Sequence, residues 1–169
     1  MTYNFIFHTS FGCSAVLYSK DPFRITEILL LCPDKKAVLK KTKGCNVNSG
    51  DTDSRVLSVA KSIQDYFLGK IKFFPQDFYE WMNLENITDL EKKVLLATAS
   101  IPYGKTASYG DIAKAVGRQR ACRFVGNTLA KNPFPVLVPC HRVIKSDGSC
   151  GGFGGGRDLK MRMLSLERH

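Results

Sequence analysis

The first part of the chain distributes apolar and polar residues in a way that predicts a β-sheet. Three segments are rich in β-branched and aromatic residues: 3–8, 12–18 and 23–31. Gly12 and the turn Lys20-Asp21-Pro22 separate them, as expected between neighbouring strands. In the lysine-rich stretch 35–53 we expect one more strand, followed by a mobile loop.

Residues 54–68 change to helical spacing. Their apolar side chains would share one face of a helix: Val56, Val59, Ala60, Ile63 and Phe67. The first half of the chain is therefore predicted to be a small α+β unit, with a helix packed on a sheet. We recognise no catalytic motif in it.

A shift from aromatic to polar residues at about 78–88 indicates a linker. It divides the chain into predicted domains at 1–82 and 83–169. Thr88 and Glu91 then have the spacing of a capping box. They predict a helix that continues to Ala99 and is stopped by Ile101-Pro102.

Two short helices joined by a tight turn are predicted next. Ser108 and Asp111 form a looser capping pattern, and Gly117 ends the helix that they begin. After the basic turn Arg118-Gln119-Arg120, apolar spacing predicts another helix to about residue 131. Its polar side carries Arg120, Arg123 and Asn127. The pair has the form of a DNA-binding helix-turn-helix.

Length and composition allow one large domain or two small ones, since 44% of the 169 residues are apolar. No apolar stretch approaches the roughly 18 residues of a membrane span, and the N-terminus lacks the pattern of a secretory signal. We therefore expect a soluble, cytoplasmic protein, nuclear if its source is eukaryotic, with no membrane partner.

Six widely spaced cysteines include no C-x-x-C pair, which argues against a zinc module. Four residues of the first half could still gather around a metal ion: His8, Cys13, Cys32 and Cys45. The alternative is that these are ordinary packed or surface thiols.

The net charge of +10 is concentrated in the second half of the chain. Residues 1–85 contain 11 Lys/Arg and 9 Asp/Glu, whereas residues 86–169 contain 14 and 6. A basic half suggests a polyanionic partner, nucleic acid before membrane. On charge alone, a merely basic soluble surface fits as well.

A potential nucleophile follows a buried segment. Asn132-Pro133 ends the preceding helix, and an apolar run at 134–138 leads to Pro139-Cys140-His141. A thiol attacks as the thiolate, and His141 would help to form it, directly or through a water. The alternative is an inert buried cysteine. Six glycines between 148 and 156 follow; they let backbone approach a ligand closely or act as a flexible connector.

A final helix is predicted at about 157–168, with Leu159, Met163 and Glu167 in line on one face. A carboxylate on an apolar stripe needs a partner. Glu167 would orient His141 and stabilise its cationic form, by the logic of a catalytic triad. The alternative is a frayed helix end that leaves Glu167 in water.

This half contains several short motifs in a characteristic order and spacing: Ile101-Pro102-x-Gly104, Ser108-Tyr109-Gly110, Arg123-x-Val125-Gly126, Asn132-Pro133, Pro139-Cys140-His141-Arg142-Val143 and the glycine-rich loop. Through them, residues 88–169 closely resemble the O6-alkylguanine-DNA alkyltransferases, also called methylated-DNA–protein-cysteine methyltransferases. The resemblance implies an α+β two-domain fold. Its N-terminal domain would be a small ribonuclease-H-like sheet with a helix, and its C-terminal domain a mostly helical winged helix-turn-helix.

The resemblance also implies DNA repair. Such a protein flips O6-alkylguanine, and O4-alkylthymine, out of duplex DNA and transfers the alkyl group irreversibly to its own cysteine. Cys140 matches the acceptor, so each molecule acts once. His141 and Glu167 match a water-bridged relay. Tyr109 matches the residue that donates a proton or hydrogen bond to the leaving guanine, and Asn132 the residue that ties the recognition helix to the active-site turn.

The remaining roles implied by the resemblance concern DNA and the substrate pocket. Arg123 matches the finger that fills the vacated base stack. Other residues of the DNA-binding surface would be Ala121, Cys122, Gly126 and Tyr109. The substrate pocket would be lined by Val143, Cys150, Phe153, Gly154 and Leu129. The partner would be double-stranded DNA containing O6-alkylguanine, bound by a monomer without any cofactor or metal.

The sequence departs from the family at three positions. Cys122 and Phe124 flank Arg123 where small residues are usual, and Phe153 replaces a frequent tyrosine. Outside the resemblance, Tyr109 would be a packed aromatic, Arg123 a solvated charge and Asn132 a helix-ending residue.

Three other functions explain only part of the pattern. DNA-damage-binding relatives without chemistry carry another residue in place of Cys140. A winged-helix regulator leaves Cys140-His141 and Glu167 unexplained. A thiol hydrolase lacks any oxyanion-hole pattern beyond a generic glycine loop.

Overall fold

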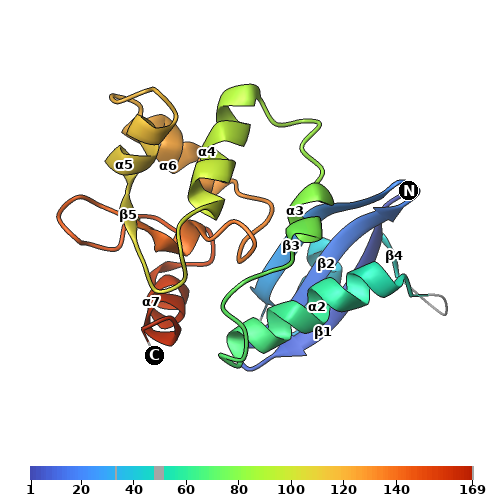
Figure 1. Cartoon of the computed structure of the whole chain (residues 1–169). Helices are drawn as coiled ribbons and strands as arrows, with labels where there is room; N and C mark the ends of the chain where they lie inside the picture. Colours follow the sequence, from blue (N-terminus) through green and yellow to red (C-terminus); the bar gives the residue numbers. More distant parts are fainter. Residues whose placement is uncertain (33, 48–51, 169) are drawn as a thin grey trace. The chain divides into compact units, whose positions relative to one another are not determined.

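The structure, a computed structural model, describes residues 1–32, 34–47 and 52–168 (Figure 1). It contains two compact units, Met1–Asn83 and Leu84–His169. The boundary lies one residue from the division expected between residues 82 and 83. The α+β class is confirmed, because a small sheet with helices forms the first unit and mostly helices form the second.

The first unit is built on a four-stranded sheet in the order β3-β2-β1-β4. The strands β1 (Tyr3–Thr9), β2 (Gly12–Lys20) and β3 (Phe23–Cys32) are antiparallel, and the short β4 (Asn46–Val47) runs parallel to β1. The three predicted strands are therefore confirmed. Helix α2 (Ser54–Phe67) lies across one face of this sheet (Figure 1), also as predicted, and its apolar side is buried.

The central strand β2 is buried on both faces because helices cover both. Val38 of α1 (Lys35–Lys41) packs against Cys13, Ala15 and Leu17 on one face, and α2 contacts β1 and β2. Successive residues of a strand point to opposite faces. This explains why β2 is buried at six consecutive positions instead of alternating.

The strand expected in the stretch 35–53 is present as the short β4, but residues 35–41 before it form helix α1. Asp34 caps it by accepting a hydrogen bond from the amide of Ala37 at 2.7 Å. A capped run of lysines around Ala, Val and Leu favours a helix. Strand β4 lies later in the same stretch, at Asn46–Val47. Residues 48–51 of the expected loop lie outside the described residues.

The expected linker at 78–88 is partly wrong as well. Residues 76–80 form the short helix α3 (Gln76–Glu80), and its Phe78 is 1% exposed in the core of the first unit. Trp81 and Asn83 exchange backbone hydrogen bonds with Ile25 of β3. Phe78 is thus a core residue of the first unit, and Trp81 is tied to its sheet, rather than part of a connector.

The second unit follows the predicted helices closely. Helix α4 (Asp89–Ala99) begins at the Thr88–Glu91 capping box, and α5 (Tyr109–Ala115) at the Ser108–Asp111 box. Helix α6 (Cys122–Ala130) follows, and α5, α6 and α4 pack on one another. The last helix, α7 (Arg157–Leu166), ends with Glu167 as its C-cap residue.

Two elements that position the site escape prediction. The turn η1 (Cys140–Arg142) is a single 3₁₀ turn, and β6 (Val143–Ile144) follows it directly. Strand β6 pairs in parallel with β5 (Ala107–Ser108), which leads directly into α5. This two-residue pairing therefore brings the start of α5, with Tyr109, beside the turn that holds Cys140. Among the described residues, no helix is long and apolar enough to cross a membrane.

Candidate active site in the C-terminal unit

Cys140 opens the η1 turn and is only 6% exposed. Asn132, just after α6, holds it in place. The Asn132 amide nitrogen donates to the carbonyl of Val138 at 2.9 Å and to the sulfur of Cys140 at 3.2 Å. Its amide oxygen accepts from the backbone N–H of Phe134 at 3.0 Å. Asn132 thus links the end of α6 to the thiol through three hydrogen bonds.

The apolar run before Cys140 makes a strained turn. Val136, which is 2% exposed, has φ 77°, a left-handed conformation that a β-branched residue rarely adopts. A hydrogen bond of 2.8 Å from the Val138 N–H to the Phe134 carbonyl closes this turn. Such strain persists only where the surrounding packing determines it. Here the buried run delivers Cys140 to the site.

His141 and Glu167 meet in the core of the unit. Their Nε2 and Oε1 atoms are 2.8 Å apart, and both side chains are at most 1% exposed. The Glu167 carboxylate also accepts a hydrogen bond of 3.1 Å from the Gly104 N–H. Glu167 is therefore neither frayed nor solvated, and the structure brings these two predicted site residues together.

Arg142 is the partner of Glu167 that sequence reasoning missed. Its Nε donates to both carboxylate oxygens, at 3.1 and 2.9 Å, and its Nη2 donates to Oε1 at 2.9 Å. Another guanidinium nitrogen donates to the carbonyl of Ile101. A buried carboxylate persists when it is paired and hydrogen-bonded. Arg142 is the charged partner of the Glu167 carboxylate. Its position next to His141 in the sequence was the signal that could have identified this partner.

Lys160 is a second charged residue that sequence reasoning missed. It lies on α7, is 0% exposed, and its Nζ donates to the Val143 carbonyl at 2.6 Å and to the Gly152 carbonyl at 3.4 Å. Among the described residues no carboxylate forms an ion pair with it. Its position three residues before Met163, on the apolar side of α7, is the signal that could have found it.

The protonation of the site follows from burial. Burial raises the pKa of the Cys140 thiol, and the Asn132 amide and the Lys160 cation act in the opposite direction. Burial lowers the pKa of His141, although its hydrogen bond to Glu167 opposes this. The resting site therefore holds a neutral thiol beside a neutral imidazole. The water bridge expected between them stays a prediction.

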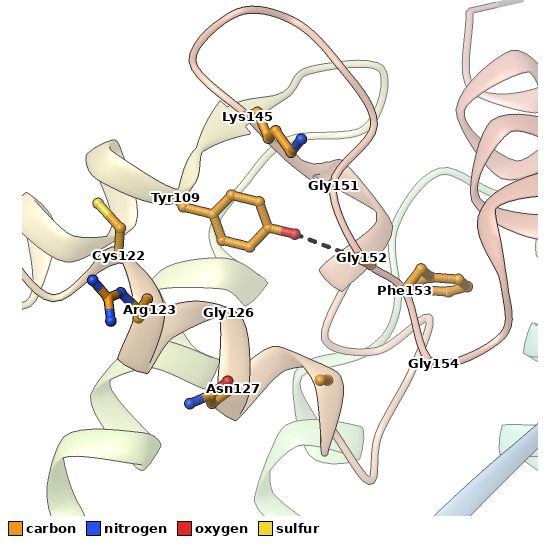
Figure 2. Close-up of a pocket in the computed structure, with 11 residues that line it drawn as sticks. Tyr109, Cys122, Arg123, Gly126, Asn127, Lys145, Gly151, Gly152, Phe153 and Gly154 are labelled. Atoms are coloured by element: carbon orange, nitrogen blue, oxygen red, sulfur yellow. Dashed lines mark hydrogen bonds between the residues drawn. The ribbon is translucent and has the colours of Figure 1, made fainter.

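Tyr109, at the start of α5, contacts the glycine-rich loop. Its hydroxyl donates to the Gly152 carbonyl at 3.3 Å (Figure 2). A Cβ at Gly151 would lie 2.6 Å from that hydroxyl, so only glycine fits there. Burial raises the pKa of the Tyr109 hydroxyl, which keeps it protonated and able to donate.

A pocket of about 490 Å³ opens between α6 and the glycine-rich loop (Figure 2). Six of the predicted site residues line it: Tyr109, Cys122, Arg123, Gly126, Phe153 and Gly154. Its other walls are formed by Asn127, Ala130, Lys145, Gly151 and Gly152. In size and in its mostly apolar lining it suits a flat organic ring.

The other predicted pocket residues lie deeper. Leu129, Val143 and Cys150 are buried and are not among the residues that line this pocket, and neither is Cys140. Ala121 is the N-cap residue of α6.

Comparison with known proteins decides the family. A family model described as the DNA-binding domain of 6-O-methylguanine DNA methyltransferase matches residues 89–169. The methylated-DNA–protein-cysteine methyltransferase of Methanosarcina mazei is 37% identical over 116 residues, which cover 66% of this chain and 67% of that protein. The chain belongs to this methyltransferase family.

Other relatives agree with this assignment. The methyltransferases of Methanosarcina barkeri and Mycobacterium leprae are 39% and 46% identical, over 65% and 48% of this chain. The matches cover 66% and 50% of those proteins, so the chain spans about half to two thirds of the length of these curated relatives.

Solved structures of the methyltransferase family share the fold. The O6-methylguanine methyltransferase of Mycobacterium tuberculosis superposes with a TM-score of 0.78 and 28% identity, covering 99% of this chain and 93% of that one. A structure of the M. tuberculosis protein in complex with DNA gives a TM-score of 0.77 at the same identity, with coverage of 98% and 92%. The similarity thus extends over both units.

The candidate metal ligands of the first unit are only partly brought together. Cys13 and Cys32 lie opposite each other on the neighbouring strands β2 and β3. Cys45 packs against the apolar cluster that contains both of them. Within residues 1–32, 34–47 and 52–168, however, no group of three or more His, Cys, Asp or Glu side chains is placed to hold a metal ion. Cys13 and Cys32 are buried, and Cys45 is partly buried.

Proposed function

We propose that this methyltransferase-family chain is a DNA repair protein that transfers the alkyl group of O6-alkylguanine in duplex DNA to its own Cys140. The observation that carries the proposal is the buried thiol held by Asn132 next to the His141–Glu167 pair. A nucleophile, a base and an orienting carboxylate are the parts of a triad. The relatives named above are methylated-DNA–protein-cysteine methyltransferases, and the M. tuberculosis protein has been solved in complex with DNA.

The proposed reaction moves one alkyl group and two protons. The Cys140 thiol loses its proton through a water to His141, whose cationic form Glu167 stabilises. The sulfur attacks the alkyl carbon, a C–S bond forms and the bond between that carbon and guanine O6 breaks. Tyr109 donates its proton to the leaving guanine as negative charge develops on the ring. The resulting thioether has no route back to the thiol, so each molecule acts once.

The pocket supports a flipped base as the substrate. A guanine inside a duplex cannot reach a thiol that is 6% exposed, so we propose that it leaves the stack and enters the pocket between α6 and the glycine-rich loop. Arg123 lines this pocket from the first turn of α6. It would fill the vacated stack, with Ala121, Cys122 and Gly126 close to the minor groove.

The finer fold descriptions belong to the same proposal. Helices α5 and α6 would form a winged helix-turn-helix, and the first unit would be ribonuclease-H-like. We further propose that the protein acts as a monomer and that O4-alkylthymine is a second substrate. The parallel β5–β6 pair supports the proposed helix-turn-helix arrangement, because it joins the start of α5 to the turn of Cys140.

Intact-mass measurement tests the reaction. The protein is incubated with a duplex that contains O6-methylguanine, and its cysteine peptides are then mapped. We expect one added methyl group, on the Cys140 peptide and on none of the other five cysteines. The Cys140→Ser variant should remain unmodified. Wild-type protein that binds the duplex yet gains no mass would instead identify a damage-binding protein without chemistry.

Arg123→Ala separates extrusion from chemistry. If Arg123 fills the stack, the variant should transfer alkyl groups from duplex DNA much more slowly, by about 10²-fold, the scale of a few kcal/mol of unstacking energy. Its reaction with free O6-benzylguanine, which needs no extrusion, should stay near the wild-type rate. Equal losses with both substrates would assign Arg123 to chemistry or folding.

A further inference from the structure

Helix α1 presents a dense group of lysines to solvent. Five exposed lysines lie within nine residues, and we call them the α1 lysine patch: Lys35, Lys36, Lys40, Lys41 and Lys43. The opposite side of the helix is fixed to the core by Val38, which is 0% exposed. Thr42, at its end, accepts a hydrogen bond of 3.0 Å from the Asn4 side chain of β1. The patch is therefore held on a rigid support.

The α1 lysine patch accounts for the net positive charge of the first unit. Residues 1–83 contain 11 Lys/Arg and 8 Asp/Glu, but outside residues 34–43 the counts are 6 and 7. In the part of the chain that the structure describes, none of the five lysines forms an ion pair. Asp34, the nearest carboxylate along the chain, caps the helix. The patch is therefore a cluster of positive charge rather than a surface of mixed positive and negative side chains.

This arrangement opposes the stability of the helix. Lys36 and Lys40 are four residues apart, where like charges repel each other, and no acidic residue stands in the first turn. Only the lysines of the last turn, Lys40 and Lys41, gain from the helix dipole. A seven-residue helix is marginal by itself. A partner that neutralises the charge would remove the repulsion.

The spacing of the lysines suits a phosphate backbone. A helical rise of 1.5 Å per residue spreads residues 35–41 over roughly 9 Å, and Lys43 follows the end of the helix. Duplex DNA carries one charge per strand for about every 3.4 Å of its axis, so about three phosphates fit that length. Lysine contacts phosphate as a point charge, and a phosphate contact carries no sequence information. The contact would thus be independent of sequence.

We propose that the α1 lysine patch is a second contact surface for the phosphate backbone of duplex DNA, in addition to α6 of the other unit. The proposal rests on the proposed function in taking DNA as the partner. The phosphates would belong to the flank of the damaged duplex or to a second duplex.

Charge removal at matched positions tests the proposal. The patch variant Lys36→Gln/Lys40→Gln/Lys43→Gln is compared with Lys20→Gln/Lys70→Gln/Lys72→Gln, which removes the same charge from other parts of the first unit. Affinity for undamaged duplexes of about 12 and about 40 base pairs is measured over a range of salt concentrations, together with the stoichiometry. Each lost phosphate contact lowers the slope of log K against log salt by about 0.9, so the patch variant should lose up to about 2.7 and the control close to none.

The duplex lengths separate the two sources of phosphate. A loss seen only with the long duplex assigns the patch to the flank of the bound DNA. Loss of a second bound short duplex assigns it to another DNA molecule. A patch variant whose slope matches the control on both duplexes overturns the proposal. So does a variant that loses binding to polyglutamate or anionic vesicles but keeps the DNA slope.

Transfer from free O6-benzylguanine serves as the independent readout. The patch variant should react at the wild-type rate, which shows that the fold is intact. If the wild-type chain fails to react, the proposed function fails, whereas the salt slopes still decide whether the patch contacts DNA.

Discussion

Replacing Glu167 by glutamine should strongly destabilise the second unit. The carboxylate accepts three hydrogen bonds from Arg142, of 2.9 to 3.1 Å, and lies 2.8 Å from His141. Glutamine keeps the shape but removes the charge, so the Arg142 guanidinium, whose side chain is 7% exposed, loses its counter-charge. Removing one partner of a buried ion pair costs about 3–5 kcal/mol. That is a large share of a typical stability of about 5–15 kcal/mol.

Urea unfolding of the wild type and three variants measures this effect. The variants are Glu167→Gln, Arg142→Met and the double Arg142→Met/Glu167→Met. The double variant should be more stable than Glu167→Gln, because apolar side chains of similar size often replace a buried pair at little net cost. The alkyl-transfer rate of Glu167→Gln, measured where it is still folded, should fall by about 10²-fold or more, since His141 loses the group that stabilises its cation.

A loss of less than about 1 kcal/mol in Glu167→Gln would refute the reasoning, because that is the scale of an exposed pair. A double variant that is no more stable than Glu167→Gln would do the same. It would mean that the two side chains do not act as a coupled pair, despite their hydrogen bonds.

Further predictions concern the support of the site. Gly104 and Gly117 have similar left-handed φ angles, of 72° and 73°. A Cβ at Gly104 would lie 2.9 Å from the backbone carbonyl oxygen of Glu167, whereas a Cβ at Gly117 would have no heavy atom within 4 Å. Alanine at Gly104 should therefore cost more in urea unfolding than the roughly 1–3 kcal/mol of strain expected at Gly117; equal costs would contradict this. Lys160→Met should slow alkylation of Cys140 by free O6-benzylguanine by on the order of 10²-fold and shift its pH profile to higher pH, while Lys160→Arg keeps the wild-type profile; an unshifted profile in Lys160→Met would show a packing role alone. Because burial lowers the pKa of His141, the folded state resists protonation there. The contribution of His141 to stability should be complete above about pH 6.5 and decline as the pH falls below it. A His141→Gln variant should show a flatter acid limb in pH-dependent unfolding.

Local patterns along the chain determined much of the fold. The capping boxes at Thr88 and Ser108 marked the first residues of α4 and α5, since a cap involves only residues within one turn. Helix α1 was missed because its cap, Asp34, stands in a polar lysine-rich stretch without apolar periodicity. The β5–β6 pair was missed because two-residue strands carry no pattern of their own.

By itself, the sequence determined that Cys140 stands beside His141 and that Glu167 lies on the apolar side of the last helix. Adjacency and helical spacing are local properties, so they can be read before the chain folds. The tertiary structure alone decided what surrounds these residues. Arg142 and Glu167 are 25 residues apart, and Lys160 donates to a carbonyl 17 residues away. Such contacts depend on how α7 docks against the η1 turn. No local periodicity specifies that docking, yet the docking decides which buried charges are paired.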